Sequence, residues 1–256
     1  MDGVTIHARE LAPARDGGEP ILMLHGLGVA IGSLGPLAER LAERHPVLAC
    51  DMPGFGRSTA SEIWPTARIA VAMERFMRLR GLGRAVLLGH SYGCHVAASV
   101  AAAHPERVSA LILLSPAFSR RFGSPAAQIA RLVLDAPMER PSLVAGGIRD
   151  QLRAGPRRAL RTLREASGIP LGDLLEASHL PILIVRGSRD PLTTARWARE
   201  LRGRAAGPAR VALIPGAAHG LGHDAPAAVA RAVEAFLVSS AAGHRTRMPR
   251  PGSAAP

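Results

Sequence analysis

Short apolar runs alternate along the chain with longer segments whose apolar residues recur at helical spacing. The runs lie at 21–24, 46–50, 85–88, 110–114, 181–185 and 211–214. Between them, Leu34, Leu37 and Leu41, and the stretches 66–80 and 225–237, follow the periodicity of amphipathic helices. Apolar strands that alternate with helices predict an α/β fold, in which a mostly parallel central sheet is flanked by helices on both faces.

The alternation is interrupted between 117 and 179, where no clean strand pattern occurs. Helical fragments at 128–134 and 157–166 are broken by prolines, so we expect a helical cap here, or else a set of packing helices. Residues 239–256 contain no Ile, Leu, Val or Phe and are expected to be disordered. The predicted organisation is an α/β core in two parts, 1–116 and 180–238, an inserted cap at 117–179 and a tail at 239–256.

A Gly-x-Ser-x-Gly motif, Gly89-His90-Ser91-Tyr92-Gly93, follows the run 85–88 and precedes a helical stretch rich in Ala and Val. Strand, motif and helix in this order are typical of a nucleophile elbow, a strained turn that presents the serine hydroxyl at a helix N-terminus. A side chain at either glycine would crowd the neighbouring strand or helix. The N–H groups and dipole of the helix favour a developing negative charge there. Ser91 is therefore the predicted nucleophile.

A serine hydroxyl needs a base within hydrogen-bond reach and an acid that orients the base. The best base is His219, in a loop after the run 211–214, and the best acid is Asp190, after the run 181–185. The 29 positions between them fit one helix and one strand, which would bring both residues to the same edge of the sheet. The chain order Ser, Asp, His is that of one fold class.

Acyl transfer also requires donors for the oxyanion. One predicted donor is the backbone N–H of Tyr92, directly after the nucleophile. The second is expected from the loop 25–28, where the N–H of Leu27 lies between two glycines that allow the backbone to approach a substrate closely.

The other candidate residues are assigned structural roles. We expect His25 to brace the loop after the first strand and His90 to pack against the sheet. His223 and Asp224 lie near His219 and are alternative candidates for the catalytic site, but a helix is predicted to begin beside them. Aspartates in the predicted cap are expected on solvated faces, namely Asp135, Asp150 and Asp173.

The formal charge of +12 does not by itself indicate a nucleic-acid partner. All 32 basic residues are arginine, and the chain contains neither lysine nor asparagine. Because Arg, Ala, Gly and Pro use GC-rich codons, a GC-rich genome explains this bias, and the few aromatic residues argue against base stacking. We therefore expect no nucleic-acid partner and a small-molecule substrate.

The amino-terminal residues show no basic start followed by an apolar core, and no run of eighteen apolar residues occurs. We expect no signal peptide, no membrane span and a cytoplasmic location. Two cysteines, Cys50 and Cys94, do not make a disulfide framework and are expected to be buried apolar residues.

Together these motifs resemble those of the α/β-hydrolase fold family, on the branch of small esterases, lactonases and carbon–carbon bond hydrolases. The matching stretches are 24–28, 51–58, 89–93, 104–108, 187–191 and 215–219. The resemblance implies that Ser91 is the nucleophile, His219 the base and Asp190 the acid. It also implies that no cofactor and no metal are needed and that the segment 117–179 covers the pocket.

Three features of this chain depart from particular branches of the family. Haloalkane dehalogenases would carry aspartate at position 91, where this chain has serine. Hydroxynitrile lyases use a lysine, and meta-cleavage hydrolases usually show an asparagine in the site, but this chain contains neither residue. We therefore predict a cofactor-independent serine hydrolase, esterase-like, that cleaves a carboxylic ester, thioester or lactone through an acyl-enzyme. The alternatives are an acyltransferase or perhydrolase, a carbon–carbon bond hydrolase, or a slow-turnover ligand-binding protein. Ten arginines against six acids in 117–179 also raise the alternative of an anionic acyl substrate.

Overall fold

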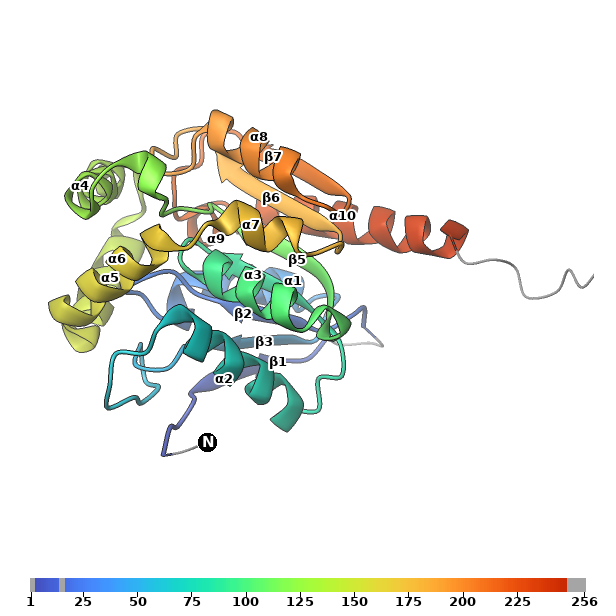
Figure 1. Cartoon of the computed structure of the whole chain (residues 1–256), viewed down its shortest axis with the longest axis horizontal. Helices are drawn as coiled ribbons and strands as arrows, with labels where there is room; N and C mark the ends of the chain where they lie inside the picture. Colours follow the sequence, from blue (N-terminus) through green and yellow to red (C-terminus); the bar gives the residue numbers. More distant parts are fainter. Residues whose placement is uncertain (1–2, 14–16, 248–256) are drawn as a thin grey trace, which may run out of the picture.

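A computed structural model describes residues 3–13 and 17–247, with only the backbone of 241–247. Seven strands form one sheet between two layers of helices (Figure 1). The strands are β1 (Ala8–Leu11), β2 (Ile21–Leu24), β3 (Val47–Cys50), β4 (Ala85–His90), β5 (Val108–Leu114), β6 (Ile182–Gly187) and β7 (Ala209–Ile214). The helices are α1 (Gly35–Leu41), α2 (Thr66–Leu79), α3 (Gly93–Ala103), α4 (Pro125–Asp135), α5 (Pro141–Ala154), α6 (Pro156–Gly168), α7 (Leu171–Glu176), α8 (Ala195–Arg204), α9 (Leu221–Asp224) and α10 (Pro226–Arg247).

The strand order is β1-β3-β2-β4-β5-β6-β7. All neighbouring pairs are parallel except β1 and β3, which are antiparallel. The six apolar runs of the sequence became β2 to β7, so the predicted α/β fold with a mostly parallel sheet is confirmed. Because parallel strands end at one edge, the loops after β2, β4, β6 and β7 lie close together.

Side chains that alternate along the strands divide the core between the two faces of the sheet. On β2, Leu22 and Leu24 pack with residues of α2, α3, α7 and α8. Their neighbours Ile21 and Met23 pack on the opposite face with α1 and α10. All four are fully buried. This two-sided burial explains why the strands read as continuous apolar runs rather than as alternating ones.

Between β5 and β6 the chain forms α4, α5, α6 and α7. The first three, here called the insert helices, lie beyond the carboxyl ends of the strands (Figure 1), whereas α7 packs against α3 and α8. The predicted fragments 128–134 and 157–166 lie within α4 and α6. The prolines that break this region into fragments include Pro125, Pro141 and Pro156, which begin α4, α5 and α6. Proline fits the first turn of a helix, where its missing N–H costs nothing.

The end of the chain differs from the expectation of a disordered tail at 239–256. Helix α10 continues past the predicted end at 237 and reaches Arg247, while residues 248–256 lie outside the described part. No helix within 3–13 and 17–247 is long and apolar enough to cross a membrane.

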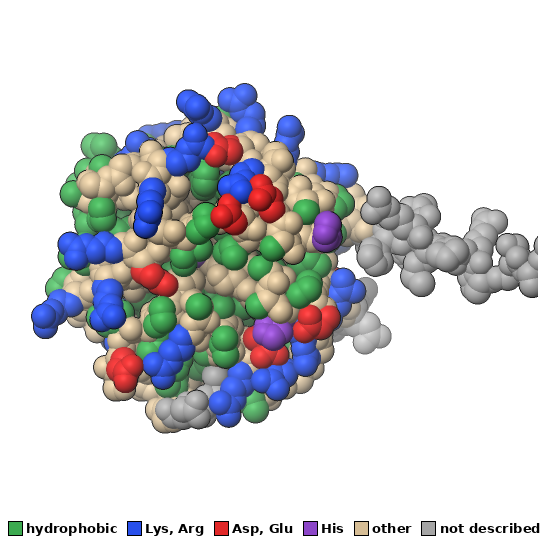
Figure 2. Space-filling view, in the orientation of Figure 1, with side chains coloured by type: hydrophobic (Ala, Val, Ile, Leu, Met, Phe, Trp, Pro, Cys, Tyr) green, Lys and Arg blue, Asp and Glu red, His purple; other side chains and the backbone are tan. Residues whose placement is uncertain are grey.

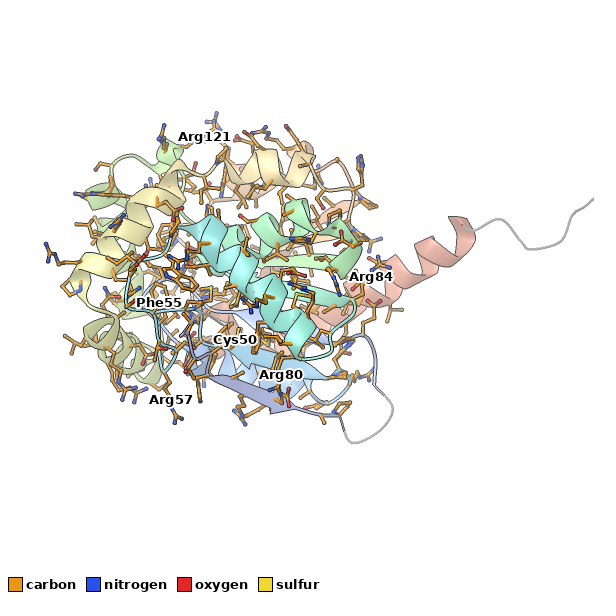
Figure 3. All side chains as sticks on the ribbon, turned by 60° about the horizontal axis from the view of Figure 1, so that its bottom comes forward. Cys50, Phe55, Arg57, Arg80, Arg84 and Arg121 are labelled. Carbon is orange, nitrogen blue, oxygen red and sulfur yellow. The ribbon has the colours of Figure 1, made fainter. Side chains whose placement is uncertain are left out.

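Arginines lie at the periphery of the molecule, as Figure 3 shows for Arg57, Arg80 and Arg121. Cys50 lies in the interior of the molecule. Both Cys50 and Cys94 are free and buried, as predicted. The basic charge is thus a surface property of the fold.

Candidate active site

The turn between β4 and α3 carries Ser91 in a strained backbone conformation. Its φ is +52°, in the left-handed region that non-glycine residues rarely adopt. A Cβ at Gly89 would collide with the backbone of Gly93, and a Cβ at Gly93 would collide with the carbonyl of Leu24 on β2. Both glycines are therefore required by close packing, and the turn lifts the Ser91 side chain to the carboxyl edge of the sheet.

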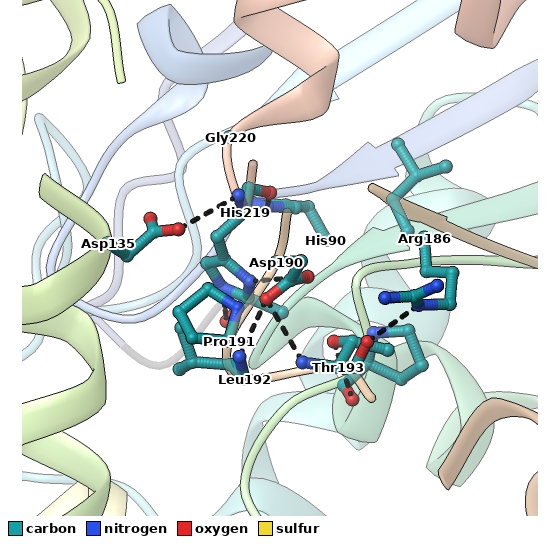
Figure 4. A network of polar contacts seen from close by, with 12 residues as sticks. His90, Asp135, Arg186, Asp190, Pro191, Leu192, Thr193, His219 and Gly220 are labelled. Atoms are coloured by element: carbon teal, nitrogen blue, oxygen red, sulfur yellow. Dashed lines mark hydrogen bonds and ion pairs between the residues drawn. The ribbon is translucent and has the colours of Figure 1, made fainter. Parts of the chain in front are cut away.

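Three side chains from separate loops form one hydrogen-bonded series at this edge. The Oγ of Ser91 lies 3.0 Å from Nε2 of His219, and Nδ1 of His219 lies 3.1 Å from Oδ2 of Asp190. The other carboxylate oxygen of Asp190 accepts hydrogen bonds from the N–H groups of Leu192 at 2.8 Å and Thr193 at 3.0 Å (Figure 4). These two bonds orient the carboxylate so that Oδ2 faces the imidazole.

His219 and Asp190 shift each other's pKa. Burial works to lower the pKa of His219, but the Asp190 carboxylate and its hydrogen bond outweigh burial and hold the pKa above the ordinary 6.5. For Asp190, burial works to raise the pKa, but the proximity of His219 and its hydrogen bond hold it well below its usual range. Asp190 is therefore ionised at neutral pH and favours the tautomer of His219 that donates from Nδ1 and leaves Nε2 to accept from Ser91.

The two predicted oxyanion donors are the backbone N–H groups of Leu27 and Tyr92. Leu27, in the loop after β2, lines the same cavity as Ser91, and Tyr92 directly follows Ser91 in the elbow. Within the described residues, neither N–H donates to a protein acceptor. His25 braces the loop as expected, because its Nε2 accepts from the N–H of Met52 at 2.9 Å and its Nδ1 donates to the Gly26 carbonyl at 2.7 Å. The structure thus brings all five predicted site residues to one edge.

His90 does more than pack against the sheet. Its ring lies 5.1 Å from that of His219, and its Nε2 donates to the His219 carbonyl oxygen at 3.0 Å. Burial, followed by the positive charge that His219 can carry, lowers the pKa of His90 to about 3. His90 is therefore neutral and holds the loop that carries His219. The rivals His223 and Asp224 pair with each other at 2.9 Å, and neither contacts Ser91.

The sequence analysis missed two acidic residues of the insert that contact the histidine loop. Asp135, at the end of α4, accepts a hydrogen bond from the N–H of His219 at 3.1 Å (Figure 4). Glu139 accepts from the N–H of Gly220 at 2.5 Å. The expectation that Asp135 lies on a solvated face is wrong, because the helix turns it inward to partner a buried N–H. Asp150 is also buried, whereas Asp173 is exposed as expected.

The acidic pair gives a stability prediction. Burial, then hydrogen bonding with Asp135 and Asp224, raises the pKa of Glu139 from 4.5 to about 9. Between these pH values the unfolded chain releases this proton and the folded protein keeps it, so wild-type stability falls as pH rises from 4.5 towards 9. Because Glu139 is partly solvated, we expect Glu139→Gln to raise Tm at pH 8 by only about 2–4 °C, roughly 1 kcal/mol.

The same change should give almost no gain in Tm at pH 4.5, where Glu139 is protonated in the folded protein and already half protonated in the unfolded chain. Differential scanning calorimetry at the two pH values measures the effect. Glu62→Gln, at an exposed position, is the matched control and should change Tm little at either pH. A gain for Glu139→Gln that is equal at both pH values would contradict the assigned protonation.

Ser91 and His219 open into a cavity of about 480 Å³ between the sheet edge and the insert helices. Residues of the loop after β2 form one side, and residues of α4 and α5 form the other. Its size lies in the range of small-molecule sites. Among the described residues, no group of three or more His, Cys, Asp or Glu is arranged to hold a metal ion.

Comparison with known proteins agrees with this architecture. A family model described as the alpha/beta hydrolase fold matches residues 19–136, and one described as a TAP-like protein matches 165–247. The chain belongs to the α/β-hydrolase fold family, as the sequence motifs predicted. The residues 137–164 between the two matches include α5 and most of α6.

Individual relatives include hydrolases and acyltransferases. The (E)-2-((N-methylformamido)methylene)succinate hydrolase of Acinetobacter baylyi is 26% identical over 246 residues, which cover 86% of this chain and 90% of that protein. A probable 1-acylglycerol-3-phosphate O-acyltransferase of Oryza sativa is 34% identical over 123 residues, 46% of this chain and 28% of that protein. The chain spans only 27–30% of the length of four of the curated relatives that it matches, among them this acyltransferase.

Among solved structures, the enol-lactonase from Burkholderia xenovorans LB400 has the same fold. The two superpose with a TM-score of 0.78 at 21% identity, over 93% of this chain and 98% of the lactonase.

Proposed function

We propose that this protein is a serine hydrolase that cleaves a carboxylic ester, thioester or lactone. Ser91 Oγ attacks the carbonyl carbon while Nε2 of His219 takes its proton. The tetrahedral intermediate then collapses, the leaving group receives that proton from His219, and an acyl-enzyme forms on Ser91. Water, deprotonated by His219, attacks the acyl carbon, and a second tetrahedral intermediate forms. Its collapse breaks the bond to Ser91 Oγ, which receives the proton back from His219, and the acid is released. Asp190 remains ionised throughout and stabilises the imidazolium.

The observation that carries this proposal is the continuous hydrogen-bonded series from Ser91 through His219 to Asp190, open to a cavity. The N–H groups of Leu27 and Tyr92 support it, because unpaired donors beside the nucleophile can bind the oxyanion. Each such donor contributes about 2.7–4 kcal/mol to transition-state stabilisation in enzymes of this type. In this proposal the insert helices act as a cap that excludes water from the reacting atoms.

The raised pKa of His219 gives a pH prediction. His219 can accept the serine proton only when it is neutral, so kcat/KM should rise with pH through the pKa of this residue in the free enzyme. Because Asp190 holds that pKa above 6.5, the midpoint of the acid limb should lie above 6.5. A pH profile of kcat/KM with a neutral ester measures it, and a midpoint near 5 would contradict the assignment.

A panel of p-nitrophenyl esters, thioesters and lactones tests the function itself, with Ser91→Ala as the control. The proposal expects hydrolysis of at least one class that disappears in this variant. Adding alcohol or thiol acceptors beside water distinguishes an acyltransferase, because transfer products would then exceed the free acid. Hydrolysis that is unchanged in Ser91→Ala would overturn the proposal.

A further inference from the structure

The wall of the cavity is almost entirely apolar. Above Ser91, α4 contributes Leu132 and Val133, and α5 contributes Leu143, Val144 and Ile148. Apolar surface of this kind is stabilised when it contacts another apolar group instead of water. Such a wall favours a hydrocarbon chain or ring as the part of a substrate that occupies this space.

The mouth of the cavity has the same character. Val133 of α4 is 65% exposed, and Ile148 and Leu152 of α5 are 59% and 77% exposed, yet all three also line the cavity. Large apolar side chains exposed around an opening indicate a binding surface more than a structural role. An apolar acyl chain that extends out of the cavity would cover them.

The arginines of the insert do not enter this space, and no described arginine lines the cavity. Arg131 donates to the carbonyl of Pro191 at 3.1 Å, Arg158 donates to the carbonyl of Glu62 at 2.8 Å, and Arg121 pairs with Glu200. Figure 2 shows arginines spread over the outer surface at the end formed by α4 to α6. The excess of basic residues in 117–179 therefore provides no cation for an anionic substrate.

The ionisable side chains that line the cavity include no arginine. They are His90, His219, Asp135 and Glu139. An acyl carboxylate placed here would lose its hydration without a permanently charged cation to pair with.

We propose that this site selects acyl groups that are apolar and uncharged and discriminates against acyl groups that carry a carboxylate. This inference rests on the proposed hydrolase function and specifies its substrate class. It differs from what the arginine content of the insert suggested, because the chemistry of the wall, not the charge of the surface, decides which acyl groups bind.

Matched esters test the proposal on the wild-type protein. The p-nitrophenyl esters of hexanoic acid, of adipic acid monomethyl ester and of adipic acid share the leaving group and a six-carbon acyl chain. Only the last carries a free carboxylate. We expect its kcat/KM to be at least about 100-fold below that of the hexanoate, and the neutral methyl ester to fall between them. A carboxylate ester cleaved as fast as the hexanoate, in a reaction lost in Ser91→Ala, would overturn the substrate class alone.

A variant that adds a cation at the mouth separates charge from size. Ile148→Arg should raise the ratio of kcat/KM for the carboxylate ester over the hexanoate by about tenfold, because a hydrogen bond to a charged group becomes available. Val71→Arg, at a position on α2 that is 63% exposed and outside the cavity, is the matched control and should leave the ratio unchanged. An unchanged ratio in Ile148→Arg would contradict the role of the missing cation. A wild-type protein that cleaves none of the three esters, and none of the panel above, would overturn the proposed function itself.

Discussion

Replacement of Ser91 by alanine should lower kcat by roughly 10⁶-fold, to a level at which only binding and oxyanion stabilisation remain. Alanine lacks the oxygen that attacks the substrate, and no other hydroxyl is hydrogen-bonded to Nε2 of His219 in the described part of the chain. Serine and alanine share the same Cβ, so the strained φ of +52° at this position is no less favourable in the variant. The fold should persist, with a Tm close to that of the wild type.

Steady-state hydrolysis of the best ester of the panel, combined with thermal unfolding, measures this effect. Ser33→Ala is a matched control, because Ser33 also lines the cavity but its hydroxyl donates to the carbonyl of Ala30 at 2.8 Å. We expect this control to change kcat by a few-fold at most. A Ser91→Ala protein that is folded and retains more than about a hundredth of the wild-type kcat would contradict the assignment of the nucleophile.

Replacement of Asp190 by asparagine should lower kcat by about 10⁴-fold. The asparagine side chain keeps the shape and can still accept from Leu192 and Thr193. Its amide group then donates towards Nδ1 of His219 and favours the tautomer with the proton on Nε2, which cannot accept from Ser91. The loss of the carboxylate also removes the charge that raises the pKa of His219, so the acid limb of any residual activity should move to lower pH.

Asp150→Asn provides the control for this substitution. Asp150 is a buried aspartate of α5 that pairs with Arg149 and does not line the cavity. The Asp150→Asn variant should have a kcat within about twofold of the wild type and an unchanged pH profile. An Asp190→Asn protein with near-normal kcat, or with an acid limb moved to higher pH, would show that Asp190 does not orient and charge-stabilise His219.

The parts of the site that lie on the sheet could be predicted from the sequence because parallel strands end at one edge. Each apolar run predicted a strand, and a polar residue in the loop after the strand was then placed at that edge, as with Asp190 after β6 and His219 after β7. The crossover between them, α8, has the length that their spacing requires. The elbow was predictable because close packing requires both of its glycines.

The contributions of the insert could not be predicted in the same way. Asp135 and Glu139 contact the histidine loop only because α4 ends over it, and no periodicity in 117–179 indicates how these helices sit on the core. The prolines of the insert indicate where one helix gives way to the next, but not how the helices pack on the core. The direction in which the arginines of the insert point depends on partners such as Glu200 and the carbonyl of Pro191, which lie far away in sequence.

Covalent labelling by a fluorophosphonate tests most directly whether His219 and Asp190 activate the Ser91 hydroxyl. The wild-type protein should gain one adduct in the intact mass, peptide mapping should assign the adduct to Ser91, and Asp190→Asn should label far more slowly. No adduct at all, or an adduct on another residue that forms equally fast in Ser91→Ala, would contradict the account.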